Sequence, residues 1–436
     1  MRSRKASYGS TIHWSTWRGS RGLVAVLTPA LVATFACGEA VESPTAPASA
    51  PTLAAAATAT LMVRQVNAGN LHNCAVATDN RAYCWGWNVF GQIGDGTTSY
   101  ERPTPTLVRG GLSFRQISAG TYHTCGVTTA NRAYCWGLGG HVGDGTNMSR
   151  LRPVPVAGGL SFRQVSAGQE HTCGVTTDDR VYCWGDNVFG QLGNGTTGDI
   201  GYPELSPVAV MGTLRFRGVS VGIYHSCGVT TTDRAYCWGG DQWGQVGDGA
   251  ASGTCQVTFN TLPCRKKPTL VAGGYRWRQV DAGGGNGPGE DQTGPTSAGR
   301  TCGVTTDGRA FCWGDGTQGQ NGDGTRSIRT APSKVAGDRL YRAVSTGHFH
   351  SCAVATNNRA YCWGMNHAGQ VGDGTEGTMR LRPRAVVGGL LFDQVSAGDA
   401  STCGRTATGA AYCWGFNVGK GLDSYYLTPQ PVGGAS

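Results

Sequence analysis

Short apolar runs recur along the chain between clusters of Gly, Asn and Asp. The stretch SFRQVSAGQEHTCGVTTDDRVYCWGDNVFGQLGNGT, residues 161–196, shows the pattern. It predicts strand B at 162–166, strand C at 172–176 and strand D at 180–184, and the Pro-x-x-Val piece at 153–156 supplies strand A. The unit is therefore expected to be a four-stranded antiparallel sheet.

The turn between strands C and D fixes their register. Pairing about Asp178 sets Cys173 opposite Cys183 and Gly174 opposite Tyr182. We expect the small residue to leave room for the tyrosine ring.

The same unit is written seven times. Aligning the chain on Cys-Trp-Gly places seven tryptophans in one slot: Trp85, Trp136, Trp184, Trp238, Trp313, Trp363 and Trp414. The second cysteines follow one another at 51, 48, 54, 75, 50 and 51 residues, a period typical of propeller blades and too long for ankyrin or leucine-rich units. The pattern predicts an all-β, seven-bladed β-propeller of four-stranded blades over residues 61–436.

Ring closure is predicted from the two ends of the repeat region. The first repeat begins with strand B at 62–66, and no strand A precedes it. The C-terminal segment 428–434 carries an A-type sequence. We expect this C-terminal strand to complete blade 1, because a closed ring leaves no blade face exposed.

The repeat resembles that of the regulator of chromosome condensation family. The resemblance rests on the following residues of the third copy: Gly168, His171, Tyr182, Trp184, Gly185, Asn187, Gly190, Gln191, Leu192, Gly193 and Gly195. It covers about residues 61–436 and implies the propeller fold. Such repeats serve as scaffolds for unrelated binding functions. The family name implies guanine-nucleotide exchange on a small GTPase as an alternative activity.

The N-terminus is typical of an export signal. Residues 1–36 combine a basic stretch with fifteen mostly apolar residues at 22–36, which is short for a membrane span. Cys37 follows, and then an Ala/Pro/Thr-rich tether to residue 60. Cleavage and acylation at Cys37 would resemble a bacterial lipoprotein, and an ordinary cut near Ala36 is the alternative. We expect an exported protein, secreted or held at the cell envelope, with a lipid anchor as its sole membrane contact.

The cysteine count supports an oxidising compartment. Beside Cys37, sixteen cysteines form eight pairs at hairpin spacing: Cys74 with Cys84, Cys125 with Cys135, Cys173 with Cys183, Cys227 with Cys237, Cys302 with Cys312, Cys352 with Cys362, Cys403 with Cys413, and Cys255 with Cys264. Directly opposite hairpin positions are close enough for disulfides, whereas zinc sites usually use C-x2-C. Eight disulfides and an export signal argue against nucleotide exchange in the cytosol.

Composition and charge narrow the partner classes. The chain has 71 glycines and only 14% charged residues, which favours dense turns. Its net charge of +9 includes five cations in residues 1–36, and the remaining 31 cations and 27 acids are scattered in sequence. This scatter predicts no clustered basic face, and therefore no nucleic-acid partner.

The repeated polar slots have structural interpretations. Histidines stand two residues before a cysteine in five copies: His72, His123, His171, His225 and His350. Sevenfold symmetry spreads them around the ring, so we expect them to satisfy backbone groups and not to bind a metal. The repeated Gly-Asp-Gly-Thr predicts a tight turn, because one carboxylate per loop is too few to bind calcium. The repeated tryptophans are expected to pack between blades. No catalytic constellation or cofactor motif is visible, and the chain is expected to be non-catalytic.

Two insertions break the repeat near blade 5. They lie at 250–268, within the connection from strand D to strand A, and at 283–299, between strands B and C. By strand parity both emerge on the same face at blade 5, so we expect this face to bind a protein or glycan, and the chain to be a monomer. The candidate partner-binding residues are Phe259, Arg265, Lys266, Lys267, Glu290 and Asp291. Neutral insertion into solvent loops is the alternative.

Overall fold

The computed structural model describes residues 60–250, 253–257, 260–286, 297–416, 418 and 425–433. The predicted signal segment, Cys37 and the tether up to residue 59 lie outside this described part. So do the candidate residues Phe259, Glu290 and Asp291. Among the described residues, no helix combines the length and the apolar composition needed to cross a membrane.

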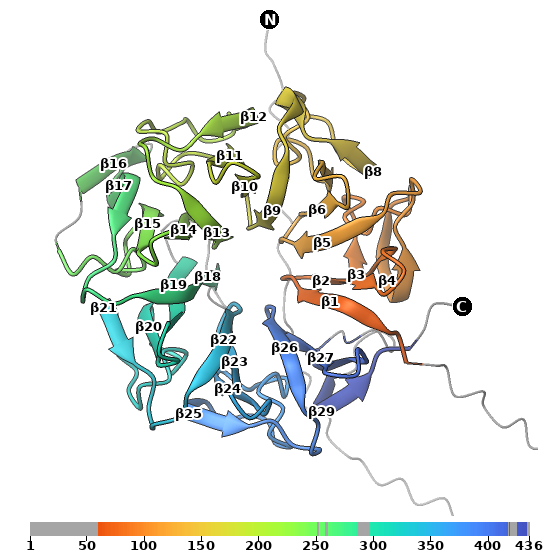
Figure 1. Ribbon diagram of the computed structural model, residues 1–436, viewed down its shortest axis with the longest axis vertical. Coiled ribbons are helices and arrows are strands. Elements are labelled where there is room, and N and C mark those ends of the chain that lie inside the picture. The colour runs from red at the N-terminus through yellow and green to blue at the C-terminus, as the bar shows by residue number, and fades with distance from the viewer. Residues whose placement is uncertain are drawn as a thin grey trace, which may run out of the picture. The chain divides into compact units, whose positions relative to one another are not determined.

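Seven antiparallel sheets stand around a central channel, so the chain is an all-β seven-bladed propeller (Figure 1). The innermost strands are β1 (Val63–Ala68), β5 (Phe114–Ala119), β9 (Phe162–Ala167), β13 (Phe216–Val221), β18 (Trp277–Asn286), β22 (Tyr341–Thr346) and β26 (Phe392–Ala397). The second strands are β2 (His72–Ala77), β6 (His123–Thr128), β10 (His171–Thr176), β14 (His225–Thr230), β19 (Ser297–Thr305), β23 (His350–Ala355) and β27 (Ser401–Thr406).

The outer half of each blade holds the remaining strands. The third strands are β3 (Ala82–Asn88), β7 (Ala133–Gly137), β11 (Val181–Gly185), β15 (Ala235–Gly240), β20 (Ala310–Gly314), β24 (Ala360–Gly364) and β28 (Ala411–Phe416). The fourth strands are β4 (Ser99–Leu107), β8 (Arg150–Pro155), β12 (Glu204–Ala209), β17 (Asn260–Leu270), β21 (Arg329–Lys334), β25 (Arg380–Ala385) and β29 (Tyr425–Pro431). A fifth strand, β16 (Gly253–Val257), extends one blade, and η1 (Ala157–Gly159) is a short 3-10 turn.

Each blade is built from consecutive strands, which corrects the predicted closure. In every sheet the fourth strand pairs with the third strand of the same sheet. Strand β4 therefore completes blade 1, and β29 pairs with β28 in blade 7. The prediction that the C-terminal strand completes blade 1 is therefore wrong. A strand that follows its neighbour in the chain needs only a short connection to pair with it. The ends still meet, because the amide N–H of Leu61 donates to the carbonyl of Val432 at 2.8 Å.

The predicted hairpin register is the one observed, but its small residue accommodates a different ring. Cys173 lies opposite Cys183 and Gly174 opposite Tyr182. A Cβ on Gly174 would lie 2.6–2.7 Å from ring atoms of Phe162 on β9, so the space serves that phenylalanine.

The structure joins the sixteen cysteines in the eight pairs expected from their spacing. Seven of these disulfides cross-link the second and third strands of a blade, and the eighth bridges the β16–β17 hairpin. The blade disulfides join Cys74 to Cys84, Cys125 to Cys135, Cys173 to Cys183, Cys227 to Cys237, Cys302 to Cys312, Cys352 to Cys362, and Cys403 to Cys413. The hairpin disulfide joins Cys255 to Cys264. Every blade thus carries a covalent link at its centre.

The hydrophobic core lies between the blades. Each of seven buried clusters in the described residues combines side chains of two neighbouring blades, including the pair formed by blades 7 and 1. The repeated tryptophans belong to these clusters. Trp184, for example, is fully buried and donates its indole N–H to the carbonyl of His141 in the preceding blade at 3.0 Å. Burial of each such side chain stabilises the ring by about 1.5–3 kcal/mol.

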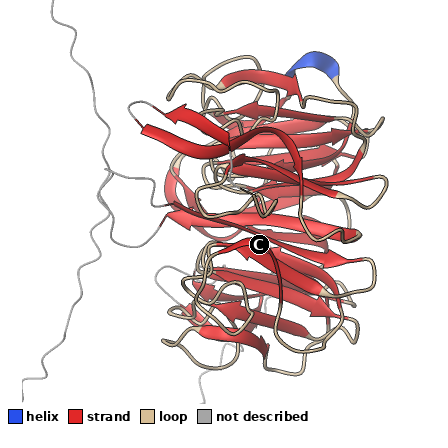
Figure 2. Cartoon of the chain, turned by 90° about the vertical axis from the view of Figure 1, so that its left-hand side faces the viewer, coloured by secondary structure: helices blue, strands red, loops and turns tan. Residues whose placement is uncertain are grey.

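The two insertions belong to adjacent blades. Strands β16 and β17 pair as a hairpin, in which β17 completes blade 4 and β16 widens it (Figure 2). The second insertion lengthens β18 and β19 in blade 5. The sequence-based assignment of both insertions to blade 5 is thus corrected. Strand A joins the sheet of the repeat before it.

Candidate functional site

The channel is enclosed by the seven innermost strands and consists of two joined cavities. The narrower cavity, of about 110 Å³, lies where these strands end, and all seven blades line it. The wider cavity, of about 350 Å³, lies toward their beginnings and is lined by blades 1–5. Asn67, Ser118, Ser166, Ser220 and Asp281 line both cavities.

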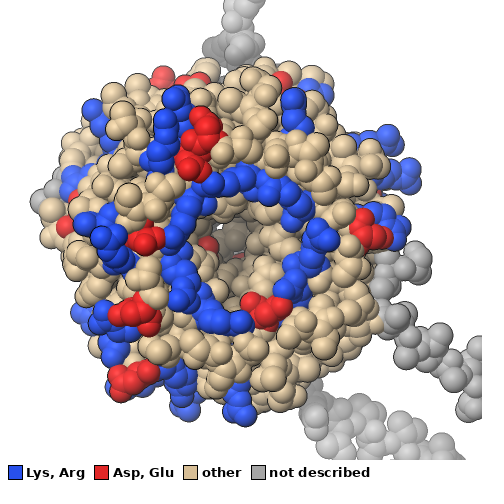
Figure 3. Space-filling view, viewed as in Figure 1, with Lys and Arg blue, Asp and Glu red and all other residues tan. Residues whose placement is uncertain are grey.

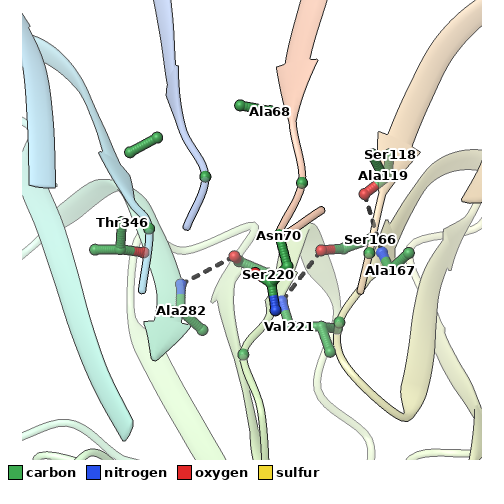
Figure 4. Close-up of a pocket in the computed structure, with 18 of the residues that line it drawn as sticks. Ala68, Asn70, Ser118, Ala119, Ser166, Ala167, Ser220, Val221, Ala282 and Thr346 are labelled. Carbon is green, nitrogen blue, oxygen red and sulfur yellow. Dashed lines mark hydrogen bonds between the residues drawn. The ribbon is translucent and has the colours of Figure 1, made fainter. Parts of the chain in front are cut away.

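Side chains in the channel wall bind each blade to the next. Ser118 accepts the backbone N–H of Ala167 at 3.0 Å, Ser166 that of Val221 at 3.1 Å, and Ser220 that of Ala282 at 2.9 Å (Figure 4). The same slot makes this bond in every blade, including Ser396 to Ala68 across the seam between blades 7 and 1. The polar wall is thus a set of contacts between blades.

A second row of contacts comes from the glutamines of the innermost strands. Gln164 accepts the N–H of Val219 at 3.1 Å and donates to its carbonyl at 2.8 Å. Five glutamines make this pair of bonds: Gln65, Gln116, Gln164, Gln279 and Gln394. The wider cavity is therefore lined by amides held against the neighbouring backbone.

A ring of glycines forms the narrow end. A Cβ on Gly347 would lie 1.9 Å from the carbonyl oxygen of Gly398, and a Cβ on Gly398 would lie 2.3 Å from that of Gly69. Each blade supplies one such glycine: Gly69, Gly120, Gly168, Gly222, Gly283, Gly347 and Gly398. The glycine of the repeat is required by this close approach of backbones.

The repeated histidines link blades through hydroxyl groups, and of the backbone partners expected from the sequence His225 and His350 have one each, at Arg300 and Asp399. The Nε2 atom of His171 lies 2.8 Å from the Ser226 hydroxyl, which donates to the carbonyl of Gln191 at 2.9 Å. Since the hydroxyl proton is used there, Nε2 carries the ring proton and Nδ1 is unprotonated. Burial lowers the pKa of His72, His171, His225 and His350 to about 3 and that of His123 well below its ordinary value. No cluster of His, Cys, Asp or Glu in the described residues could hold a metal ion.

Blade 5 replaces this histidine with Arg300. The fully buried guanidinium donates to the carbonyls of His348 at 2.6 Å and Gly347 at 2.9 Å, and burial lowers its pKa to about 10. Asp281 stands in the serine slot of the same blade, and burial raises its pKa. It accepts the Ser220 hydroxyl and the Thr346 amide at 2.9 and 2.7 Å. In blade 5 the two residues that depart from the repeat, Arg300 and Asp281, thus form hydrogen bonds to the neighbouring blades.

Blade 3 holds a pair of acids that the sequence pattern did not single out. Burial, followed by the charge of Asp186, raises the pKa of Glu170 to about 7. Burial also raises the pKa of Asp186, whose carboxylate accepts the Gln191 side chain at 3.0 Å. Glu170 occupies a variable slot between the repeated glycine and histidine, so the repeat gave no signal for it.

The Gly-Asp-Gly-Thr loops are turns closed by ion pairs. Asp144 accepts the amide and hydroxyl of Thr146 and pairs with Arg150 at 2.6 Å. Equivalent pairs join Asp95 to Arg102, Asp248 to Arg265, Asp323 to Arg329, and Asp373 to Arg380. These carboxylates are occupied by arginine within the blade.

The structure describes three of the six predicted partner-binding residues, and the surroundings of these three differ. Arg265 holds the same register position as Arg150 and pairs with Asp248 inside blade 4. Lys266 is half-buried, and its carbonyl accepts the Gly195 amide of blade 3 at 3.0 Å. Lys267 is exposed. The remaining three candidates lie outside the described residues.

The opposite end of the channel carries a ring of arginines. The second residue of the innermost strand is arginine in six blades, and in blade 7 Asp393 takes that place while Arg405 reaches the ring from β27. The arginine rim therefore comprises Arg64, Arg115, Arg163, Arg217, Arg278, Arg342 and Arg405. Figure 3 shows basic side chains encircling this mouth.

This rim corrects the inference from scattered charge. Its arginines lie about one repeat apart in sequence, so no run of basic residues reveals them, yet the ring gathers them at one mouth. The signal was available at the start of strand B, where an arginine follows an apolar or aromatic residue in six of the seven repeats. A repeated charged slot predicts a charged ring whenever the repeats close around an axis.

Comparison with known families agrees with this geometry. Two models described as the regulator of chromosome condensation (RCC1) repeat together match more than half of the chain. One matches residues 63–92, 114–141, 162–191, 216–245, 341–370 and 392–419, and the other matches 79–127, 178–229 and 307–354.

Individual relatives share the repeat region. The Ultraviolet-B receptor UVR8 of Arabidopsis thaliana is 28% identical over 63% of this chain and 58% of its own length. Human E3 ubiquitin-protein ligase HERC2 is 26% identical over 76% of this chain and 7% of its own length. The chain thus spans less than two thirds of either relative.

Solved structures show the same fold. Human WBSCR16 aligns with a TM-score of 0.67 at 19% identity, covering 81% of this chain and 93% of that one. Prp20p of Saccharomyces cerevisiae, described with its binding to Gsp1p and histones, aligns at 0.63 and 20% identity, covering 77% of this chain and 80% of that one. At these identities the likeness concerns the fold alone.

Proposed function

The chain belongs to the RCC1-repeat family, and on that premise we propose that it is an exported, non-catalytic binding protein whose propeller presents loops to a protein or glycan partner. The observation that carries the proposal is the β16–β17 hairpin. It adds a strand that the other blades lack, and the disulfide between Cys255 and Cys264 bridges it. The disulfide restricts the conformations of this long connection, and a long connection held in a defined conformation favours a role in recognition.

Placement of the insertions supports one binding face. Strand β15 runs in the direction of β13, since each pairs antiparallel with β14. The hairpin therefore begins on the face where the innermost strands end. The extension of β18 and β19 continues from the end of an innermost strand and lies on that same face. Exposed positions of the hairpin, such as Thr254, Gln256, Thr261 and Lys267, provide polar contact area.

Export is part of the proposal and is supported by chemistry. Eight disulfides persist in an oxidising compartment, and Cys37 lies at the end of the apolar N-terminal stretch. Intact mass and thiol counting on the natively expressed protein test this part. An acylated chain beginning at Cys37, or a chain cut near Ala36, without reactive thiols in the propeller would support export. A full-length cytosolic chain with reduced cysteines would refute it and favour nucleotide exchange.

The binding role is tested by shortening the hairpin. Residues 250–264 are replaced by a connection of the length found in blade 3, which keeps Arg265 and the rest of β17 in place. Cross-linking to extracellular proteins and a glycan array then compare this variant with the intact protein. We expect loss of one defined partner in the variant. A matched control shortens the 197–203 connection of blade 3, and equal partner profiles for all three proteins would refute the proposal.

A further inference from the structure

The positive charge of the arginine rim exceeds the negative charge of the carboxylates that pair with its arginines. Arg163 pairs with Asp179 at 2.5 Å, Arg217 pairs with Asp233, and Arg405 pairs with Asp393. The four other rim arginines have no carboxylate partner within the described residues: Arg64, Arg115, Arg278 and Arg342. They form two adjacent pairs, in blades 1 and 2 and in blades 5 and 6.

These guanidinium groups are held in place but not saturated. Arg115 donates to the carbonyl of Phe162 in the next blade at 3.1 Å, and Arg342 donates to that of Phe392 at 3.3 Å. The Nε atoms of Arg115, Arg163 and Arg342 are buried without a hydrogen-bond partner. Because those Nε atoms are buried, the donors left for a ligand are the N–H groups of the exposed Arg64 and Arg278 and the remaining terminal N–H groups of Arg115 and Arg342.

Rim arginines of neighbouring blades repel one another. Burial, followed by the charge of Arg163, lowers the pKa of Arg115, although the group remains protonated at neutral pH. An anion placed between such groups would relieve this repulsion and satisfy the free donors. The rim is therefore built to receive negative charge.

We propose that the arginine rim binds carboxylates on an acidic segment of a partner protein. The rim itself shows the chemistry, because Arg405 takes both oxygens of Asp393 through two nitrogens. Carboxylates on separate flexible side chains fit the two separated pairs of uncompensated arginines. A phosphodiester backbone needs a continuous basic track, and Asp179, Asp233 and Asp393 interrupt the ring. The glutamines below the rim hold the neighbouring backbone, so recognition takes place at the rim.

The rim proposal depends on the proposed function in one respect only, namely that the chain is a binding protein. Innermost strands begin at the rim and end at the glycine ring, so the rim and the insertions lie on opposite faces. The two proposals can therefore be refuted independently of each other. Loss of hairpin-dependent binding leaves the rim proposal intact, and loss of rim binding leaves the hairpin proposal intact.

The test uses the full-length oxidised protein and a labelled glutamate-rich peptide. Fluorescence anisotropy measures its affinity, with a peptide of the same length carrying glutamine as the neutral probe. The variant R64Q/R278Q removes two exposed rim charges that donate only within their own blades, to Thr78 and Thr306. We expect the affinity for the acidic peptide to fall at least about fivefold, and wild-type binding to weaken with salt.

The matched control removes two charges outside the rim. Arg132 and Arg359 are exposed at the start of β7 and β24, on the same face. We expect R132Q/R359Q to bind the peptide within about twofold of wild type. Equal loss in both variants, or no difference between the two peptides, overturns the proposal. Tighter binding of a single-stranded DNA or a sulfated glycan at the same ionic strength also overturns it, since the rim would then serve another class of partner.

Discussion

At the residue scale, buried polar side chains serve mainly to bind one blade to the next. His171 lies against a hydroxyl of blade 4, Gln164 against the backbone of that blade, and Ser166 accepts one of its amides. Such groups are stable when buried because their hydrogen bonds replace those to water. Their protonation states consequently affect the stability of the ring.

Stability is expected to fall steeply in mild acid. The folded pKa of four slot histidines is about 3, against an ordinary value of 6.5, and that of His123 is also depressed. The contribution of these groups is fully present above pH 6.5 and is lost as pH falls toward 3, because only the unfolded chain takes up protons in this window. Each histidine would remove up to about 1.4 kcal/mol per pH unit.

Urea unfolding at a series of pH values checks this slope. The variant H171Q should lower the slope by one histidine's share, whereas H367Q, at an exposed position, should leave it unchanged. A free energy of unfolding that is constant between pH 6.5 and pH 4 would contradict the neutral, buried state of the histidines.

Glu170 has the opposite effect on stability. Its folded pKa of about 7 lies above the ordinary 4.5, so its contribution is complete below pH 4.5 and is lost as pH rises through 7. We expect E170Q to be more stable than wild type at pH 8, by up to about 3 kcal/mol, and equal to it near pH 4. Thermal melts at the two pH values measure the difference. E376Q at an exposed site is the control, and equal gains in both variants would count against a buried carboxylate.

At the scale of elements, the blade hairpins and the inserted hairpin have similar cross-links in different surroundings. The disulfide between Cys173 and Cys183 joins β10 and β11 in the middle of a sheet, with ten residues of sequence separation. The disulfide between Cys255 and Cys264 joins β16 and β17 at an outer edge, with nine. Loop length is nearly equal, so any difference in effect comes from where each hairpin is packed.

We expect removal of the central disulfide to destabilise the whole ring. C173A/C183A should cost about 2–3 kcal/mol in the free energy of unfolding and lower the main transition in calorimetry. C255A/C264A should leave that transition in place, because the edge hairpin can open while the ring stays folded. A main transition lowered equally by both variants would show that the hairpin unfolds together with the ring.

At the scale of the whole molecule, the fold was predictable because one unit is repeated. Seven aligned copies made the register of Cys173 and Cys183 and the packing of Trp184 predictable. The partner of the C-terminal strand was not, because repeat phase alone cannot show whether strand A joins the preceding or the following sheet. The arginine rim was missed for a related reason. Charge counted along the chain does not show which residues meet when Arg64 and Arg342 are brought to one axis.

The closing seam between blades 7 and 1 is expected to be the point at which the ring is most sensitive. At the other six seams the peptide chain itself connects the blades. At this seam only non-covalent contacts hold them, including the bonds from Gln394 to Val66 and from Ser396 to Ala68. Losing these bonds weakens the contact between two segments that lie far apart in sequence. Bringing such segments together has a larger entropic cost than bringing together blades that are neighbours in sequence.

We therefore expect Q394A/S396A to cost more than Q164A/S166A at the seam between blades 3 and 4, by more than the one additional hydrogen bond, from Asn67 to Ser396 at 3.4 Å, that the closing variant loses. The internal variant should lose about 2–3 kcal/mol, the sum of its hydrogen bonds, since the chain still holds blade 4 against blade 3. The closing variant should also expose β1 and β26 to hydrogen exchange before global unfolding. Urea titration and exchange measured by mass spectrometry compare the two. Equal costs and equal protection of β1 would mean that the ring unfolds as one unit, with closure no weaker than any other seam.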